Sequence, residues 1–166
     1  MKKVILWSLA IIITIAAAVY QRHTGPTYPK ELDVTLNNNL HKLKLVRSLA
    51  LNERSEVKLL INDTTVKAKL FYKRFMSVEE YHSRDFSYKD YPLDSEKGLF
   101  AEVPQQPAAG KLQYYFEITD SKGTQSWFKD KPIVIRFKGG VPAFILIPHI
   151  LFMFLAMLFS TLAGLM

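Results

Sequence analysis

The residues of this 166-residue chain that are most suited to catalysis or metal binding are its four histidines, His23, His41, His82 and His149. None lies two, three or four residues from another, the spacings that build local metal sites. The chain also has no cysteine, which excludes thiol catalysis, disulfide bonds and cysteine-based zinc sites. We therefore expect exposed or locally hydrogen-bonded histidines, with no bound metal and no cofactor.

The stretch YHSRD places His82, Ser83 and Asp85 close together in sequence. In principle His82 and Asp85 orient each other beside a serine. Catalytic triads, however, are assembled across a fold and not from neighbours in one loop. The sequence thus predicts no catalytic residue and no enzyme, and His82 and Asp85 stay as candidate functional residues.

The acidic stretch KDYPLDSEKG offers Asp90, Asp94 and Glu96 as oxygen ligands for calcium. It lacks the regular ligand spacing of a calcium loop, and Lys89 and Lys97 interrupt its negative charge. We expect a solvated loop here.

His149 lies in an uncharged apolar run, Phe144 to Met166. Ionisable residues inside a membrane are usually functional or face the interior of a helix bundle. His149 is only about one helical turn from the start of the run, so a hydrogen-bonded imidazole at the membrane interface is an equal alternative. It is the third candidate functional residue.

The elements that must position these side chains begin with two apolar runs, Val4 to Tyr20 and Phe144 to Met166. A transmembrane helix needs roughly 20 mainly apolar residues, and about 17 is the lower limit. The second run is long enough to span a membrane, and the first is at the limit.

The N-terminus combines Lys2 and Lys3 with the first apolar run. Basic residues stay on the cytoplasmic side, which predicts a cytoplasmic N-terminus and an extracytoplasmic middle segment. Signal-peptide cleavage after Ala18 is one reading. Trp7 and Tyr20, placed as interfacial aromatics, favour a retained signal anchor.

The middle segment holds all 15 acidic residues of the chain. Its lysines alternate with these acids and do not gather on one face, which argues against nucleic-acid binding. Its partners are expected to be the lipid bilayer and, in addition, other membrane helices or an extracytoplasmic protein.

Period-two alternation runs through the middle segment. In LQYYFEIT, Leu112, Tyr114, Phe116 and Ile118 share one face of a half-buried strand. Similar stretches occur at ELDVTL, LKL, SEVKLLIND, VKAKLFYK, GLFAEV, TQSWF and IVIRF. Seven or eight short strands separated by turn residues predict a mainly β fold, an antiparallel β-sandwich.

Two local features modify this pattern. Arg47 interrupts an apolar face and predicts a bulge or break between strands. SVEEYH, from Ser77 to His82, has a serine followed by glutamate, which predicts a short helical turn.

The expected organisation follows from these elements. It is a cytoplasmic N-terminus (1–3), a first transmembrane helix (4–20), an extended Pro/Gly linker (21–30), a β-sandwich domain (31–138), a second linker (139–143) and a second transmembrane helix (144–166).

The stretches TGPTYP and PIVIRFKGGVPAFILIPHILFMFLAMLFSTLAGL are similar to those of a group of uncharacterised bacterial membrane proteins. Proteins of this group have an N-terminal span, an extracytoplasmic immunoglobulin-like or fibronectin-like domain and a hydrophobic C-terminal region. The resemblance implies an Ig-like sandwich and no assigned activity, and its members continue into further spans, whereas this sequence stops at Met166.

Two expectations for function follow. In the first, the chain is a bacterial inner-membrane protein whose exported β-sandwich is a binding or assembly module. In the second, it is the N-terminal part of a longer polytopic transporter, insertase or membrane enzyme with its working residues beyond residue 166. The small residues Ser160, Thr161, Ala163 and Gly164 suit close packing with neighbouring helices and favour this second reading.

Overall fold

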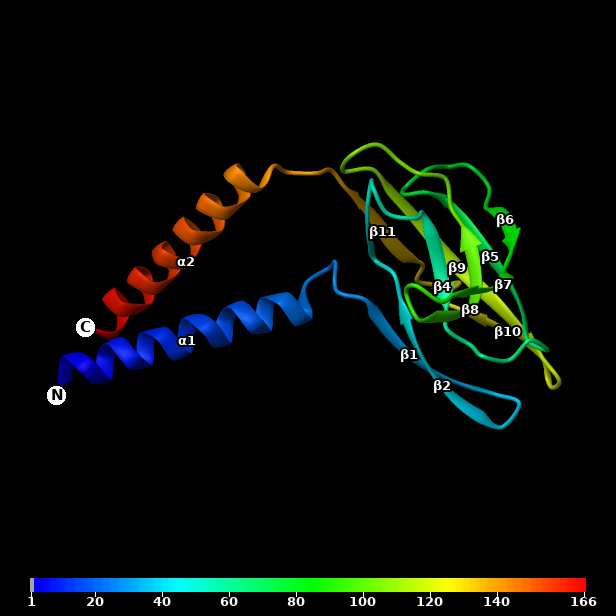
Figure 1. Cartoon of the computed structure of the whole chain (residues 1–166), viewed down its shortest axis with the longest axis horizontal. Coiled ribbons are helices and arrows are strands. Elements are labelled where there is room, and N and C mark those ends of the chain that lie inside the picture. Colours follow the sequence, from blue (N-terminus) through cyan, green and yellow to red (C-terminus); the bar gives the residue numbers. More distant parts are fainter. Residues whose placement is uncertain (1) are drawn as a thin grey trace. The chain divides into compact units, whose positions relative to one another are not determined.

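A computed structural model describes residues 2–166 (Figure 1). The chain divides into two compact units. The helical unit comprises the residues up to Pro26 together with Gly140 to Met166, and the β unit runs from Thr27 to Gly139.

The helical unit consists of α1 (Lys2–Thr24) and α2 (Ala143–Leu165), which pack against each other. Each has 23 residues and measures roughly 34 Å, enough for about 30 Å of hydrocarbon. Both helices are long and apolar enough to cross a membrane. Ala10 and Thr14 of α1 and Leu162 of α2 are buried, and the rings of Trp7 and Phe159 meet edge to face at 6.4 Å.

Both helices begin before the apolar runs, and α1 also continues past Tyr20. Arg22 and His23 form its last turn, where basic side chains are favourable beside the exposed carbonyl groups. Pro148 lies inside α2, in its second turn, where it removes the backbone donor that would otherwise bond to the carbonyl of Phe144.

The larger sheet of the β unit has six strands. Its order is β3-β11-β9-β5-β6, with β10 paired to β9. The strands are β3 (Ser48–Ala50), β5 (Lys67–Arg74), β6 (His82–Asp85), β9 (Lys111–Asp120), β10 (Gly123–Trp127) and β11 (Ile133–Lys138). All of its pairings are antiparallel except β3 with β11, which is parallel.

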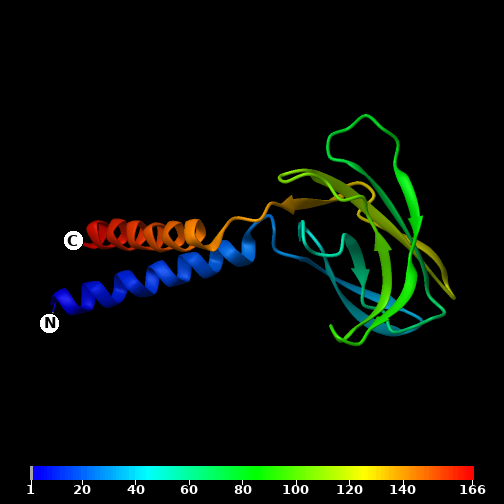
Figure 2. The same ribbon diagram turned by 45° about the horizontal axis from the view of Figure 1, so that its top comes forward.

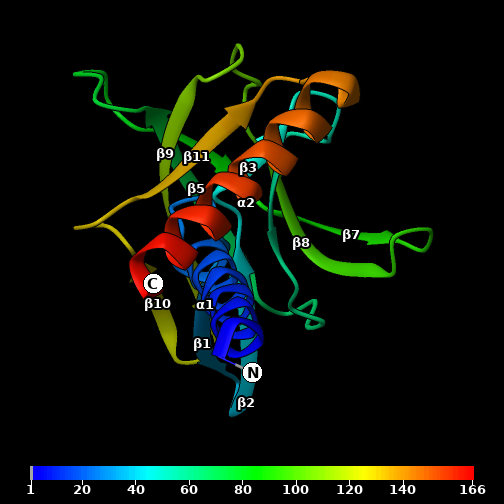
Figure 3. The same cartoon turned by 90° about the vertical axis from the view of Figure 1, so that its left-hand side faces the viewer.

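The smaller sheet has the order β4-β8-β7, with β4 (Glu56–Leu59), β7 (Ser87–Tyr91) and β8 (Glu96–Glu102). The strongly curved β7–β8 hairpin can be followed in Figure 3. Gly98 in β8 has φ +154°, and a Cβ there would lie 2.5 Å from the carbonyl oxygen of Leu59. Only glycine allows β4 and β8 to approach this closely.

A separate hairpin of β1 (Lys30–Leu36) and β2 (Asn39–Leu45) completes the β unit. Its inward residues Val34, Leu36, Leu43 and Leu45 join the same core as the two sheets. The other large, fully buried side chains of that core are Tyr114, Phe116, Phe137, Leu59, Ile61, Leu70, Leu112 and Ile118. The β unit therefore has one continuous hydrophobic core.

Both connections to the helices leave the β unit at the same end, here called the entry end. Arg47 donates from Nη1 to the carbonyl oxygen of Tyr28 at 3.5 Å and accepts at its own carbonyl from the amide of Arg136 at 3.0 Å. The start of the β unit thus lies beside β11, from which the chain leaves at Gly139.

The opposite end, here called the far end, is held by Asn37 in the β1–β2 turn. Its amide group donates to Asp63 at 2.9 Å, and its side-chain oxygen accepts from the Ser121 hydroxyl at 2.6 Å. Its backbone amide donates to Asp120 at 3.3 Å. One asparagine therefore ties together the β1–β2, β4–β5 and β9–β10 turns.

The structure confirms a mainly β fold of antiparallel sheets between two apolar helices. It also confirms the break at Arg47, which lies between β2 and β3. The predicted helical turn at Ser77–His82 is wrong. Ser77 Oγ does accept from a nearby amide, that of Glu79 at 3.1 Å, but the chain then extends into β6 because His82 pairs with Tyr72 of β5.

Candidate functional site

An open hollow of about 470 Å³ lies at the entry end of the β unit. Its walls come from the end of β5, the β5–β6 connection, the β8–β9 loop and the start of β9. The lining residues are Tyr72, Lys73, Arg74, Glu79, His82, Pro104, Gln106 and Leu112. Aromatic, amide, basic and acidic groups therefore converge on one depression.

His82 contributes its imidazole to this hollow. Its Nε2 lies 3.7 Å from Glu79 Oε2, and its ring centroid is 5.8 Å from that of Tyr72. The pKa of Glu79 is lowered, chiefly because the Ser77 hydroxyl donates to its carboxylate at 2.7 Å. His82 is thus an exposed histidine with a carboxylate neighbour, an arrangement suited to contacting a partner.

Asp85 lies three residues further along β6. Side chains three apart on a strand point to opposite faces, so His82 and Asp85 do not orient each other. All four residues of β6 are exposed, and Ser83 pairs across the sheet with Phe71. The structure does not bring the YHSRD stretch together as a triad.

His149 lies in α2, in the helical unit, with an exposed side chain. Among residues 2–166, no group of three or more histidine, aspartate or glutamate side chains is arranged to hold a metal ion.

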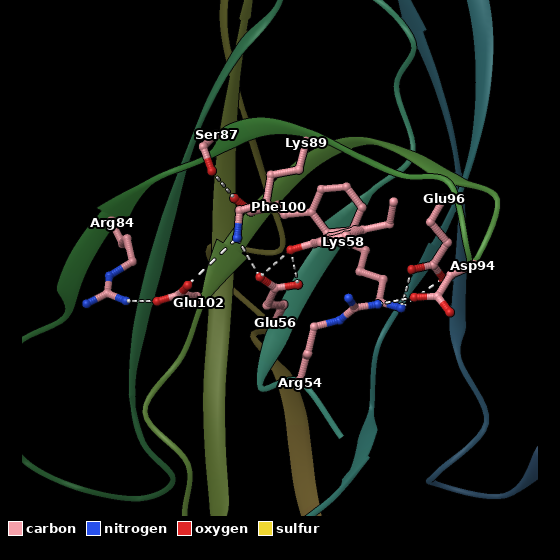
Figure 4. Close-up of polar contacts among 11 residues, drawn as sticks. Arg54, Glu56, Lys58, Arg84, Ser87, Lys89, Asp94, Glu96, Phe100 and Glu102 are labelled. Atoms are coloured by element: carbon pink, nitrogen blue, oxygen red, sulfur yellow. Dashed lines mark hydrogen bonds and ion pairs between the residues drawn. The ribbon is translucent and has the colours of Figure 1, made fainter. Parts of the chain in front are cut away.

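A cluster of charged side chains covers the smaller sheet (Figure 4). Its centre is Glu56, which is only 3% exposed. Lys89 Nζ donates to Glu56 Oε1 at 2.6 Å, and the Tyr91 hydroxyl lies 3.2 Å from the same oxygen. The hydrogen bond to Glu56 raises the pKa of Lys89.

Further ion pairs surround this buried carboxylate. Lys58 pairs with Glu96 at 2.6 Å, Arg54 with Asp94, and Arg84 with Glu102 at 3.4 Å. Arg54 also stacks over the Tyr91 ring at 4.0 Å. The cluster therefore connects β4 with the β7–β8 hairpin through charged side chains that are paired with one another.

The acidic stretch of this hairpin is in part the solvated loop that the sequence predicts, because residues 92–95 form an exposed turn. Asp90 instead lies in β7 and Glu96 in β8, and Asp90 pairs with Lys97 across the hairpin at 3.4 Å. Asp94 lies in the turn between the two strands. The lysines that interrupt the stretch are thus the ion-pair partners of acids in and around it.

The outer face of the larger sheet carries an aromatic group. Phe71 and Tyr115 stack with ring centroids 4.7 Å apart, and Tyr81 meets Tyr115 edge to face at 4.9 Å. Gln113 donates to the Tyr81 hydroxyl at 2.6 Å. Burial is the main cause that raises the pKa of Tyr115. Tyr81 thereby fixes the end of the β5–β6 connection to the sheet.

Neither Glu56 nor Asn37 is singled out by the sequence alone. Their hydrogen-bond partners are distant in sequence. Asn37 bonds to Asp63 and Ser121, and Glu56 bonds to Lys89 and Tyr91. No local signal marks Glu56, because strand alternation with Val57 and Leu59 predicts an outward side chain there. For Asn37, the pair Asn37–Asn38 between two strands is typical of a turn with positive φ, and both residues have it.

No protein-family model matches the chain, and no curated protein matches its sequence. The interpretation of function therefore depends on the geometry of this molecule.

Proposed function

We propose that this chain is a membrane-anchored binding or assembly module, with α1 and α2 crossing a bacterial inner membrane and the β unit in the extracytoplasmic space. One observation carries the proposal: the β unit buries its apolar side chains in a closed core, whereas the two 23-residue helices expose theirs. Exposed apolar helices of this length are stable in lipid and aggregate in water.

The orientation is supported by charge. Lys2 and Lys3 precede the apolar part of α1, and the positive-inside rule keeps them in the cytoplasm. α1 then acts as a signal anchor, and the β unit is exported. The absence of cysteine suits an oxidising compartment, because the domain needs no cross-links there.

The strand order supports an immunoglobulin-like sandwich of the kind in the bacterial group that the sequence resembles. In that fold the C, F and G strands form one sheet, and B, E and D form the other. The order β11-β9-β5 facing β4-β8-β7 follows this arrangement, with β3 beside β11. Such sandwiches serve many unrelated binding functions, so the fold does not specify the ligand.

The hollow at the entry end supports binding in preference to catalysis. It gathers His82 and Gln106 beside the ring of Tyr72, but its described lining residues include no nucleophile with an adjacent base. We assign to it an extracytoplasmic protein partner, and His82 is the one of the three candidate residues that contacts this partner. Asp85 and His149 lie outside the hollow.

Cysteine accessibility tests the proposed anchoring. Because the natural chain has no cysteine, Gln125→Cys in β10 and Met166→Cys after α2 each give a single label site. In intact cells, a membrane-impermeant maleimide should label the Gln125→Cys variant, and should label the Met166→Cys variant only after permeabilisation. Labelling of both variants in intact cells, or of neither, would contradict two spans.

Site-specific photo-crosslinking tests the binding part. A photoreactive amino acid at Gln106, beside the hollow, should capture a discrete partner in the native membrane, and His82→Ala should reduce the yield. The same amino acid at Lys122, at the far end, is the matched control. Equal capture from both positions would remove the hollow from the proposal.

A further inference from the structure

The connection between β5 and β6, residues 75–81, is here called the β5–β6 loop, and it projects from the strands (green in Figure 2). It presents Met76 and Val78 with exposed fractions of 83% and 103%. Phe75 before them is 37% exposed. Neighbouring, fully exposed apolar side chains on a water-soluble domain usually mark a contact surface.

Polar contacts hold the loop in this conformation. The Ser77 hydroxyl donates to the Glu79 carboxylate and accepts from the Glu79 amide, and Lys73 Nζ donates to the Glu79 carbonyl at 3.2 Å. Met76 has φ +58°, a left-handed conformation that non-glycine residues rarely adopt. The exposure of Met76 and Val78 is therefore built into the fold, and strain of this kind is common at functional positions.

The loop lies at the entry end of the β unit. The amide of Phe75 donates to the carbonyl of Lys111 at 3.1 Å, and Lys111 pairs with Arg136 of β11. From β11 the chain has only four residues, 139–142, before α2 begins. From α1 it has five, 25–29, before β1. Five Cα–Cα steps separate Lys138 from Ala143 and six separate Thr24 from Lys30, so at about 3.5 Å per step the two connections reach at most roughly 18 and 21 Å.

Basic and aromatic groups frame the two apolar side chains. Lys111 Nζ lies 5.3 Å from the Phe75 ring centroid, and Lys73 Nζ lies 4.8 Å from that of Tyr81. Arg74 is also exposed. Apolar tips with an aromatic and basic rim are typical of segments that enter the headgroup region of a bilayer.

We propose that the β5–β6 loop inserts Met76 and Val78 into the headgroup region of the same bilayer that α1 and α2 span. Lys73, Arg74 and Lys111 then face lipid phosphates. These three basic side chains outnumber the two acidic residues of the loop, Glu79 and Glu80, which are both exposed. The inference rests on the membrane anchoring proposed above, and it gives the β unit a third attachment besides its two chain connections.

The test uses the full chain in nanodiscs of phosphatidylcholine and phosphatidylglycerol. Single cysteines at Val78, Leu40 and Phe152 carry an environment-sensitive fluorophore, and quenchers are placed on lipids near the top of the acyl chain or deeper. Leu40, 62% exposed in β2 at the far end, is the matched control for an exposed apolar position. Phe152, in the middle of α2, reports on anchoring itself.

The proposal predicts blue-shifted emission at position 78 and quenching there by the shallow quencher, with no quenching at position 40. If the fluorophore is quenched at position 152 but at neither 78 nor 40, the loop proposal is overturned and the anchoring stands. Absence of quenching at 152 overturns the anchoring and the loop proposal together. A blue shift at 78 without lipid quenching assigns the loop to a protein contact, such as a second copy of the chain, and overturns lipid insertion.

Discussion

Two phenylalanines summarise the difference between the two units. Phe116 in β9 is fully buried, whereas Phe152 in α2 is 66% exposed. In the β unit, apolar side chains point inward and water is excluded from a core. In the helical unit the apolar side chains point outward, which is favourable only in an apolar surrounding. This contrast in exposure is what the proposed membrane anchoring expects of the two units.

Charged groups follow the same division. The β unit buries Glu56 and surrounds it with Lys89 and Tyr91. Unpartnered buried polar atoms occur in both units: within residues 2–166 they belong to Thr14 of the helical unit and to His41, Ser48 and Trp127 of the β unit. The two apolar runs contain no aspartate, glutamate, lysine or arginine whose charge would need a partner. The β unit therefore contains charged side chains with partners, whereas the apolar runs of the two helices contain none.

The largest effect should come from Phe116→Ala. Removing a fully buried ring leaves a cavity, and we expect the free energy of unfolding of the β unit to fall by about 3–5 kcal/mol. Denaturant unfolding followed by Trp127 fluorescence in a Trp7→Phe background measures it, since these are the two tryptophans of the chain. Phe152→Ala is the control and should change unfolding of the β unit by less than about 0.5 kcal/mol. Equal losses would contradict the division between the units.

The next largest effect is expected when a charged residue is placed in the helical unit. Phe152→Arg places a charge in the middle of α2, at a cost to membrane insertion of about 3 kcal/mol. We expect α2 to stop crossing, so that a cysteine at 166 becomes labelled from the same side as one at 125. Val141→Arg, just before α2, should leave the labelling unchanged. Normal insertion of the Phe152→Arg variant would show that α2 does not contact lipid at this position.

A smaller effect is expected from Glu56→Gln, which tests buried charge within the β unit. The substitution removes the charged acceptor from Lys89 and Tyr91, and we expect a loss of about 1.5–3 kcal/mol in unfolding free energy. Glu102→Gln is the matched control. The Glu102 side chain is 63% exposed in its ion pairs, so its loss should cost less than about 1 kcal/mol. Equal losses from the two variants would show that burial of Glu56 adds nothing to its ion pair.

The smallest expected effect is a difference between the two units in their response to acid. Hydrogen bonds from Thr65 and Asn37 lower the pKa of Asp63 below its ordinary 3.8, and backbone amides, Lys122 first, lower that of Asp120. Carboxylates with depressed pKa stabilise the fold above the unfolded value. We therefore expect the stability of the β unit to fall as the pH drops below about 4 through the folded pKa values.

Unfolding midpoints measured between about pH 7 and pH 3 check this expectation. The double variant Asp63→Asn, Asp120→Asn should show a weaker pH dependence. Helix content of α1 and α2 in nanodiscs should not change over the same range, because neither helix contains an acidic residue. An unaltered pH dependence in the double variant would mean that other groups control acid stability.

The elements that could be predicted are those whose signal is local. The alternation from Leu112 to Thr119 predicts β9, because inward and outward residues take turns along any half-buried strand. The length of the uncharged run predicts α2. Strands β6 and β7 escape prediction because they are short and polar, and β6 exists only through its pairing with β5.

The candidate site could be predicted only in part. The sequence draws attention to His82 through its neighbours Ser83 and Asp85, but strand geometry separates those side chains. Its actual surroundings include Tyr72, ten residues earlier in sequence, and Gln106 and Leu112, much later. Only the pairing of β5 with β6 and β9 brings these residues together, and no local pattern encodes that pairing.

The parallel pair of β3 and β11 also imposes an order in time. Arg136 pairs with Ser48, so the larger sheet stays incomplete until almost the whole β unit has been synthesised. β11 ends at Lys138, shortly before α2 begins at Ala143. During synthesis, the sandwich can therefore close only shortly before α2 is made. A pause in translation before β11 would leave the β unit with an open sheet and its hydrophobic core exposed.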